Sequence, residues 1–185
     1  MTLAYIVTKD PSHAAILRQI LPESSLRSVL FVSGESEYGA ESMAQKLLLT
    51  ERIPTILVMD AKTNDLSRLR EQLQDLGFLL RQAAAKTPFK IAVAVPEIEA
   101  VFFQDRALVE EIAQRHFTDL EWQLAQHHPK ELLENLPDFQ GQFIEQALER
   151  AVGDRLQTLR QHPLIQDILS FLSSLTPGVV STANP

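Results

Sequence analysis

No cysteine occurs among the 185 residues, and this absence excludes several kinds of chemistry. Without a thiol the chain forms no disulfide, thiolate zinc site or iron–sulfur cluster and has no cysteine nucleophile. Long apolar runs are also missing, since no segment approaches the roughly 18 uncharged apolar residues of a membrane span. The apolar stretch 1–8 runs directly into Lys9, Asp10 and Pro11, which makes it too short for the core of a signal peptide. The sequence therefore predicts a cytoplasmic protein without a membrane segment.

Positive charge is scarce as well. The chain has 17 Lys and Arg residues against 24 Asp and Glu residues, a formal net charge of −7, and no basic cluster. The field of the whole protein therefore does not favour nucleic acid as a partner. An unidentified protein partner or a second copy of the chain remains open. With 45% hydrophobic residues, the chain is suited to one full-sized core with a small helical addition.

Short apolar runs alternate with amphipathic segments in the first half of the chain. The runs predict strands at 3–8, 28–32, 54–59 and 89–95, and the segments between them predict helices at 11–21, 36–51 and 65–85. Alternation of this kind indicates an α/β fold with a doubly wound, mostly parallel four-stranded sheet. The run Pro54–Met59 is apolar on both faces and is therefore expected to be a central strand.

From residue 97 onward the pattern is helical only. Helices are expected at 97–103, 106–116, 118–126, 130–136, 140–160 and 163–175. The predicted organisation is an α/β core over 1–115, an all-helical C-terminal extension over 116–175 packed on that core, and a disordered tail over 176–185. The apolar stripe of 163–175 either packs on the core or forms a dimer or partner surface. Trp122 is expected in the core.

Two known functional motifs, the phosphate-binding P-loop and the hydrolase elbow, are not completed by this sequence. The segment from Gly34 to Gly39 has the glycine spacing of a phosphate-binding P-loop, but Ala40 and Glu41 stand where that motif requires Lys and Ser or Thr. No Gly-x-Ser-x-Gly sequence exists to suggest a hydrolase.

The histidines of the C-terminal half give no metal motif. His127 and His128 are adjacent, so on a helix they point in different directions and cannot chelate one ion together. Together with His116 and His162 they are expected at the surface or at helix ends.

Four acidic residues stand beyond the ends of the first, third and fourth expected strands. They are Asp10, Asp60, Glu97 and Glu99, and in a parallel sheet the ligand crevice lies beyond these strand ends. Carboxylate oxygens suit Mg²⁺, which takes oxygen ligands in octahedral geometry and often keeps several waters. The sequence therefore offers these four residues as candidate metal ligands, and Asp60, Glu97 and Glu99 as candidate catalytic residues.

Each acid also has a structural interpretation. Asp10 before Pro11 is a typical helix N-cap, and Asp65 is typical of a first helical turn. Glu97 and Glu99 lie at the start of an expected helix, where acids are favoured anyway. Asp60 has no capping role that explains it equally well, so it is the most site-like residue.

The order of these segments resembles the Toprim-like domains, and most closely small proteins related to OLD-type nucleases. The resemblance covers roughly residues 3–115 and rests on the helix start Pro11-Ser12-x-Ala-Ala-x-Leu17, on the apolar strand that ends at Asp60, and on Val95-Pro-Glu-Ile-Glu-Ala100 after the last strand. It implies a Toprim-like fold and Mg²⁺-dependent cleavage or transfer of nucleic acid. In that family the chemistry rests on a Glu after the first strand and an Asp-x-Asp after the third.

This chain departs from the family pattern at both acidic motifs. Lys9, or Thr8 in another register, stands at the first-strand Glu, and the Asp-x-Asp reads Asp60-Ala61-Lys62. An ammonium in place of a carboxylate removes a ligand and repels a metal ion. If Lys62 came within about 4 Å of Asp60, their attraction would be on the order of 4 kcal/mol at a dielectric near 20, but Lys62 can also turn into solvent.

Three hypotheses follow. The first is a Toprim-like domain with degenerate acidic motifs that acts as a non-catalytic binding or accessory module in nucleic-acid processing or defence. The second is an active Mg²⁺-dependent nuclease or phosphodiesterase with a rearranged set of acids, namely Asp60, Glu97, Glu99 and Asp10. The third is an unrelated small-molecule or protein-interaction domain.

Overall fold

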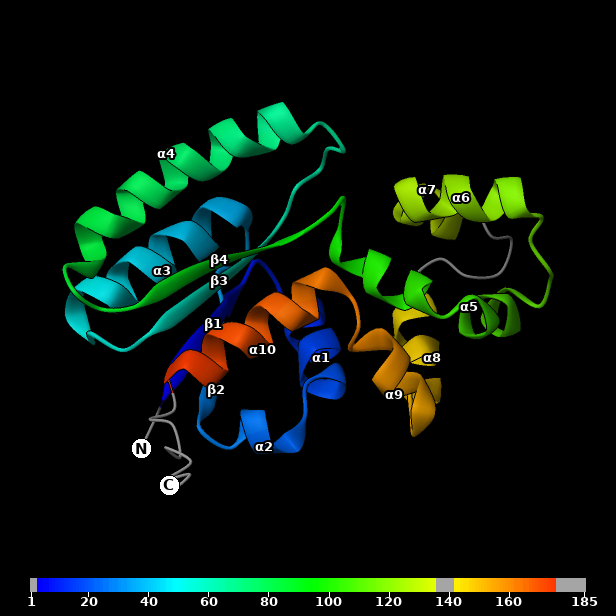
Figure 1. Ribbon diagram of the computed structural model, residues 1–185, viewed down its shortest axis with the longest axis horizontal. Helices are drawn as coiled ribbons and strands as arrows, with labels where there is room; N and C mark the ends of the chain where they lie inside the picture. The colour runs from blue at the N-terminus through cyan, green and yellow to red at the C-terminus, as the bar shows by residue number, and fades with distance from the viewer. Residues whose placement is uncertain (1–2, 136–141, 176–185) are drawn as a thin grey trace, which may run out of the picture.

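The architecture is a parallel sheet covered by helices on both faces (Figure 1). The computed structural model describes residues 3–135 and 142–175, so the predicted disordered tail at 176–185 lies outside the described residues. The strands are β1 (Ala4–Thr8), β2 (Val29–Ser33), β3 (Thr55–Asp60) and β4 (Phe89–Ala94). They form one four-stranded sheet in the order β2-β1-β3-β4, and every pairing is parallel. The predicted α/β fold and the central position of β3 are confirmed.

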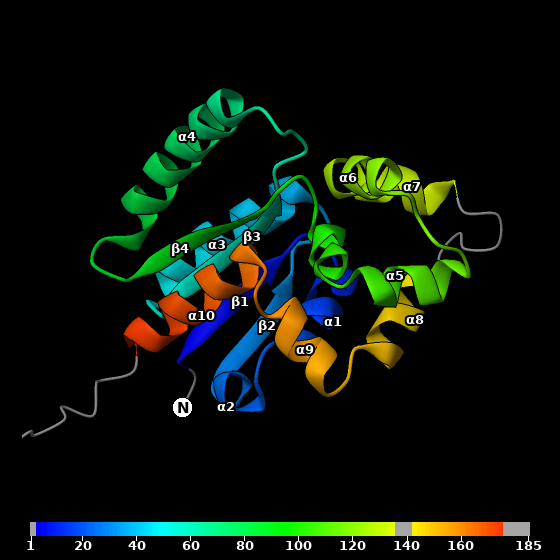
Figure 2. The same cartoon turned by 45° about the vertical axis from the view of Figure 1, so that its right-hand side comes forward.

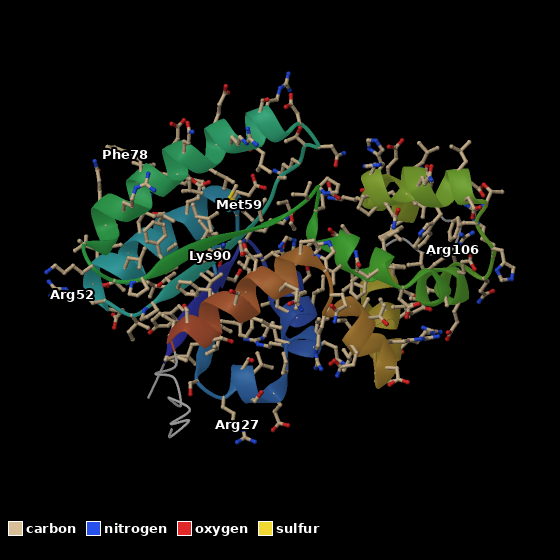
Figure 3. The ribbon with its side chains drawn as sticks, in the orientation of Figure 1. Arg27, Arg52, Met59, Phe78, Lys90 and Arg106 are labelled. Atoms are coloured by element: carbon tan, nitrogen blue, oxygen red, sulfur yellow. The ribbon has the colours of Figure 1, made fainter. Side chains whose placement is uncertain are left out.

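Two pairs of helices enclose the sheet. On one face lie α1 (Pro11–Ile20) and α10 (Pro163–Leu175), and on the other lie α3 (Glu37–Thr50) and α4 (Leu66–Ala84) (Figure 2). Alternate residues of each strand point to opposite faces, so Ile56 and Val58 pack toward α1 and α10 while Leu57 packs toward α3 and α4. Phe78, on the outer side of α4, is exposed (Figure 3).

Most of the remaining helices gather beyond the carboxyl ends of the strands (Figure 1). They are the 3₁₀ helix η1 (Ile98–Gln104), α5 (Arg106–Ala113), α6 (Asp119–His127), α7 (Pro129–Glu134), α8 (Phe143–Arg150) and α9 (Asp154–Leu159). The short helix α2 (Glu23–Leu26) lies at the opposite end of the sheet, next to β2. Two differences from the sequence prediction stand out. The short helix α2 was not expected, and the single helix expected over 140–160 is broken before α9, where Gly153 takes a positive φ of 57° that favours glycine.

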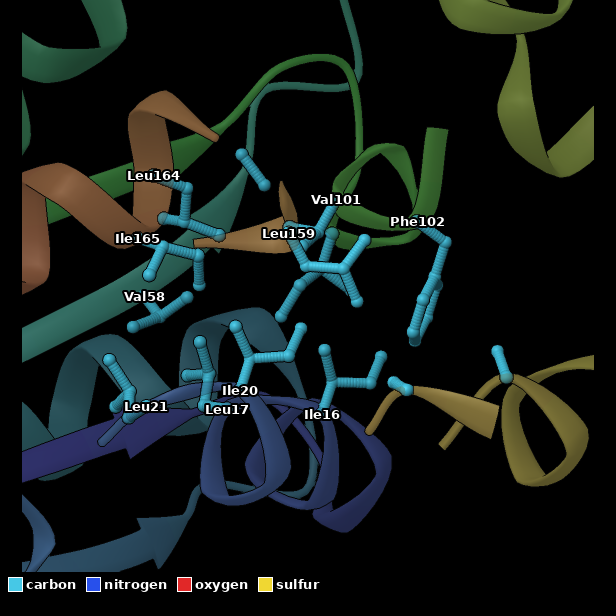
Figure 4. Packing of buried hydrophobic residues seen from close by; sticks show 14 of the residues in the cluster. Ile16, Leu17, Ile20, Leu21, Val58, Val101, Phe102, Leu159, Leu164 and Ile165 are labelled. Carbon is cyan, nitrogen blue, oxygen red and sulfur yellow. The ribbon is translucent and has the colours of Figure 1, made fainter. Parts of the chain in front are cut away.

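One hydrophobic cluster joins the two halves of the chain. Ile16 and Leu17 of α1 face Val58 of β3, Leu159 of α9 and Leu164 of α10 (Figure 4), and all of them are buried. The apolar stripe of α10 thus packs on the sheet, which confirms the first of its two interpretations. The core crosses the predicted boundary at residue 115, so α10 belongs to the layer that covers the sheet.

The glycine pair of the P-loop-like segment has a packing role. A Cβ on Gly34 would collide with the backbone nitrogen of Ala40, and a Cβ on Gly39 would collide with the carbonyl oxygen of Gly34. Ser36 between them caps α3 by accepting a hydrogen bond from the Gly39 backbone N–H. Close contact between the turn after β2 and the first turn of α3 therefore accounts for the glycine spacing without a phosphate.

His162 lies at the end of a helix, one of the two positions expected for it. It precedes the first residue of α10, but it is only 6% exposed, and its Nδ1 accepts a hydrogen bond from the backbone N–H of Leu164 at 3.2 Å. Burial lowers the pKa of His162 from 6.5 to about 4. The side chain is therefore a neutral imidazole in the folded protein at neutral pH.

This burial makes the stability of the protein depend on pH. In the unfolded chain His162 gains a proton as the pH falls through 6.5, whereas in the folded chain it stays neutral down to about 4. The unfolded state binds more protons in this window, so the stability present above pH 6.5 falls as the pH drops. Urea unfolding at about pH 7.5 and about pH 4.5 should show a His162 contribution to this loss of about 2 kcal/mol.

The matched variant is His162→Asn, whose side-chain oxygen keeps an acceptor for the Leu164 N–H but does not titrate. Its loss of stability between the two pH values should be smaller than that of the wild type by the His162 contribution. Equal losses in the two proteins would contradict the assignment.

Across the two described ranges, no helix has both the length and the apolar character needed to cross a membrane.

Candidate functional site

The candidate site lies between the two central strands, at their carboxyl ends. In the strand order β2-β1-β3-β4, β1 is followed by α1 on one face, and β3 is followed by α4 on the other. The order therefore reverses between β1 and β3, and open α/β sheets bind ligands at such a switch point. Lys9 directly follows β1, and Asp60 is the last residue of β3.

An ion pair between Lys9 and Asp60 fills this position. The Nζ of Lys9 lies 2.5 Å from Oδ2 of Asp60, and the two side chains are 23% and 2% exposed. The other carboxylate oxygen, Oδ1, accepts a hydrogen bond from the backbone N–H of Ile98 at 3.0 Å. Both oxygens of Asp60 therefore have a donor from the protein itself.

The environment keeps Lys9 charged. Burial by itself lowers the pKa of Lys9, but the hydrogen bond to Asp60 and the negative charges of Asp60, Asp10 and Glu99 outweigh it, so the pKa lies above its ordinary value. Lys9 is therefore an ammonium throughout the physiological pH range, and Asp60 faces a permanent cation.

His13, on the first turn of α1, lies next to both Asp60 and Asp10. Its Nε2 lies 3.7 Å from Oδ2 of Asp60 and 3.8 Å from Oδ2 of Asp10. Burial lowers the pKa of His13 despite these two carboxylates, so the imidazole is neutral at neutral pH. Its Nδ1 is buried, and no hydrogen-bond partner for it exists in the part of the chain that the structure describes.

Asp10 acts as the cap of α1. Its Oδ1 accepts hydrogen bonds from the backbone N–H of His13 at 3.1 Å and from the hydroxyl of Ser12 at 2.6 Å. Burial works to raise the pKa of Asp10, but these hydrogen bonds, with the charges of His13 and Lys9, hold it below its ordinary value. Asp65 likewise caps α4, one residue before the first turn in which the sequence had placed it.

The two glutamates after β4 differ in their surroundings. Glu99 is partly buried, and burial, reinforced by the charge of Asp60, raises its pKa, so it belongs electrostatically to the group around Lys9. Glu97 precedes η1 and lines a separate cavity of about 250 Å³ next to His127 and Lys130. Its Oε2 is buried and has no hydrogen-bond partner among the described residues. The structure thus groups Asp10, Asp60 and Glu99, with Glu97 to one side.

Lys62 points elsewhere. Its Nζ lies 2.7 Å from Oε1 of Glu37 at the start of α3, and its side chain is 60% exposed. The ammonium that pairs with Asp60 is that of Lys9. Sequence reasoning noted Lys9 as a missing acid but did not expect it to be Asp60's partner, and it missed His13 entirely. The available signal for His13 was its place three residues after Asp10, in a helix that begins at the same edge of the sheet.

A metal centre has little support from the donor set. Within residues 3–135 and 142–175, no three His, Asp or Glu side chains are grouped so that they could hold a metal ion. The two oxygens of Asp60 already accept from an ammonium and a backbone N–H. The residues at the switch point therefore do not fit Mg²⁺ as they stand.

Comparison with solved structures gives the fold a counterpart. The C-terminal region of the OLD protein of Xanthomonas campestris pv. campestris, in a structure phased with iodine, matches with a TM-score of 0.51 at 14% identity, over 95% of this chain and 96% of that chain. This chain has the OLD C-terminal fold. A structure of the same region phased with mercury matches with a TM-score of 0.41 at 13% identity, over 92% and 98% of the two chains. Neither a protein-family profile nor a curated protein matches the sequence.

The match to the OLD C-terminal fold runs the length of the described chain. It includes the helical half as well as the sheet, which agrees with the continuous core that joins α10 to the strands. At 14% identity the likeness establishes the fold alone.

Proposed function

We propose that this chain is a Toprim-like domain, related to OLD-type proteins, that has exchanged its metal site for an internal ion pair. It acts as a non-catalytic binding or accessory module in nucleic-acid processing or defence. The observation that carries the proposal is the 2.5 Å contact between Nζ of Lys9 and Oδ2 of Asp60 at the switch point of the sheet.

Charge is the physical basis of the proposal. A Mg²⁺ ion at this position would have to displace the Lys9 ammonium, which is hydrogen-bonded to Asp60 and which the charges of Asp60, Asp10 and Glu99 stabilise against the effect of burial. It would also lie beside a cation that repels it, since the raised pKa of Lys9 prevents the loss of its proton. The place of a catalytic carboxylate in the resembling family is thus taken by a group that neutralises Asp60.

The class of partner follows from charge as well, while the link to nucleic-acid systems comes from the fold likeness alone. A formal net charge of −7 opposes direct contact with a phosphate backbone. A protein of such a system is therefore the partner that this proposal favours.

Replacing Lys9 with glutamate tests the proposal. The wild-type chain should show no saturable Mg²⁺ or Mn²⁺ binding by isothermal titration calorimetry at millimolar metal. Lys9→Glu should bind the metal ion at least about tenfold more tightly than the wild-type chain does, a gain of about 1.4 kcal/mol in binding free energy. The reason is that the variant adds a carboxylate next to Asp60 and removes the ammonium. Metal should also raise the melting temperature of the variant and leave that of the wild type unchanged.

The control is Lys9→Met, which removes the charge without adding an oxygen ligand and should bind metal more weakly than Lys9→Glu. A wild-type chain that binds Mg²⁺ as tightly as Lys9→Glu, and cleaves DNA or RNA until Asp60→Asn abolishes the activity, would overturn the proposal. That result would favour a metal-dependent phosphodiesterase that uses Asp60, Glu97, Glu99 and Asp10.

A further inference from the structure

Strand β4 forms an open edge of the sheet. It pairs with β3 on one side, while α4 and α10 flank it above and below (Figures 1 and 2). Along its free side runs a hollow of about 720 Å³, lined by Leu73 of α4, Ile91 and Val93 of β4 and Asp167 of α10, among others. Lys90 of the strand also lines it.

The hydrogen bonds to β3 show which peptide groups of β4 face outward. The backbone N–H of Thr55 donates to the carbonyl of Pro88, and that of Ala61 donates to the carbonyl of Ala94. Because alternate residues of a parallel strand bond to the same neighbour, the even-numbered residues from 88 to 94 turn their peptide groups toward β3. The odd-numbered residues, Phe89, Ile91 and Val93, turn theirs to the free side. In the described chain, the N–H and C=O of Ile91 and Val93 have no hydrogen-bond partner.

The side chains of β4 leave this edge accessible. Lys90 points to the α10 face, where its Nζ lies 2.6 Å from Oδ1 of Asp167 (Figure 3). Phe89 and Ile91 pack on the opposite face, against the cluster that α3 and α4 cover. The one charge of the strand is therefore neutralised within the chain. Unpaired charges and bulges, which natural proteins use to protect such edges, are missing from Phe89–Ala94.

We propose that a second copy of this chain pairs with this edge, β4 against β4, antiparallel about a twofold axis at Ile91. The sheet would then continue through both copies, with four strands from each. In this register Ile91 lies opposite Ile91 of the other copy, and Phe89 lies opposite Val93. These are the residues whose N–H and C=O groups face outward, so each such pair exchanges two hydrogen bonds.

The edge of β4 is complementary to itself, which favours a second copy of this chain over an unrelated strand as its partner. On the α4 face the cross-strand pairs would be apolar and partly β-branched, a combination that stabilises antiparallel pairs. On the α10 face Lys90 would lie opposite Ala92 of the other copy, so like charges do not meet directly. Every outward peptide group of the strand finds a partner without a change in the fold.

Mass measurement gives the first test. By size-exclusion chromatography with light scattering, the full chain should have twice its 20.8 kDa mass at micromolar concentration. Ile91→Pro removes an outward N–H without breaking the ladder to β3, and proline is tolerated at such edge positions. This variant should be monomeric with the circular dichroism spectrum of the wild type. Lys90→Ala is the control that leaves the edge intact and should remain dimeric.

Single cysteines give the second test, because the chain has none of its own. In the proposed register the two Ile91 Cα atoms lie about 5.5 Å apart, within the range of a disulfide. The two Val93 Cα atoms are four residues out of register, about 14 Å apart. Under mild oxidation Ile91→Cys should therefore cross-link to a covalent dimer at least about tenfold faster than Val93→Cys.

A monomeric wild-type chain at high micromolar concentration would overturn the proposal. So would a dimer in which Ile91→Cys and Val93→Cys cross-link at the same slow rate, since that dimer would use another surface. Val93→Cys cross-linking faster than Ile91→Cys would refute the register.

Discussion

Replacing Asp60 with alanine is expected to lower the free energy of unfolding by about 3 kcal/mol. The substitution leaves the Lys9 ammonium without its carboxylate and the backbone N–H of Ile98 without an acceptor. Breaking a buried ion pair from one side costs about 3–5 kcal/mol. We expect the lower end of this range because Lys9 is 23% exposed and regains part of its hydration. Urea denaturation followed by circular dichroism measures the change.

Two further variants separate the parts of this effect. Asp60→Asn retains an oxygen for the Ile98 N–H and a polar neighbour for Lys9, so its loss should be smaller than that of Asp60→Ala. Adding Lys9→Met to Asp60→Ala should restore part of the stability, because the unpaired ammonium is removed. A loss below about 0.5 kcal/mol in Asp60→Ala would mean that the pair contributes no more than an exposed surface pair.

The sheet could be predicted well from the sequence because its signals are local. Each strand is a short apolar run, and a run that is apolar on both faces must be covered on both sides. Pro54–Met59 therefore identified a central strand, and the cap Asp10 marked a helix start that the structure confirms. The end of the sheet at which Asp60 lies followed from the same reasoning.

The partners of Asp60 were beyond this reasoning. Lys9 lies 51 residues away along the chain, and the ion pair exists only because β1 and β3 are neighbours in the sheet. The burial of His162 has the same origin, since α10 folds back over the sheet from the far end of the sequence. Periodicity within a segment carries no information on which segments meet. Local pattern thus located the acid, and topology decided its partner.

The helical half was predicted least well because short helices depend on tertiary contacts. The region 140–160 has the composition of one helix, yet it forms α8 and α9 with a turn at Gly153. A continuous helix would carry its residues away from the core, whereas the break lets Ala147 and Leu159 both lie in the buried cluster. Burial of apolar surface therefore outweighs helix propensity here.

Phe102→Ala is the other substitution with a large expected effect, and it tests whether the two halves share one core. Phe102 is 0% exposed, and its ring lies edge-on to that of Phe143 in α8, with 5.7 Å between the centroids. Removing a buried phenylalanine costs about 3–5 kcal/mol. Because η1 and α8 lie on either side of residue 115, this loss should weaken the whole molecule.

Two probes read the outcome. Circular dichroism reports on all helices, and the fluorescence of Trp122, which stacks on Phe103 at 5.4 Å, reports on the helical half. In wild type and variant alike, both signals should change in one coincident transition, shifted to lower urea in the variant. Phe78→Ala is the matched control, since Phe78 is 57% exposed and its loss should change stability by less than about 0.5 kcal/mol. If Trp122 instead reported a separate, earlier transition, residues 116–175 would be a unit of their own, and the continuous cluster beneath α10 would not couple them to the sheet.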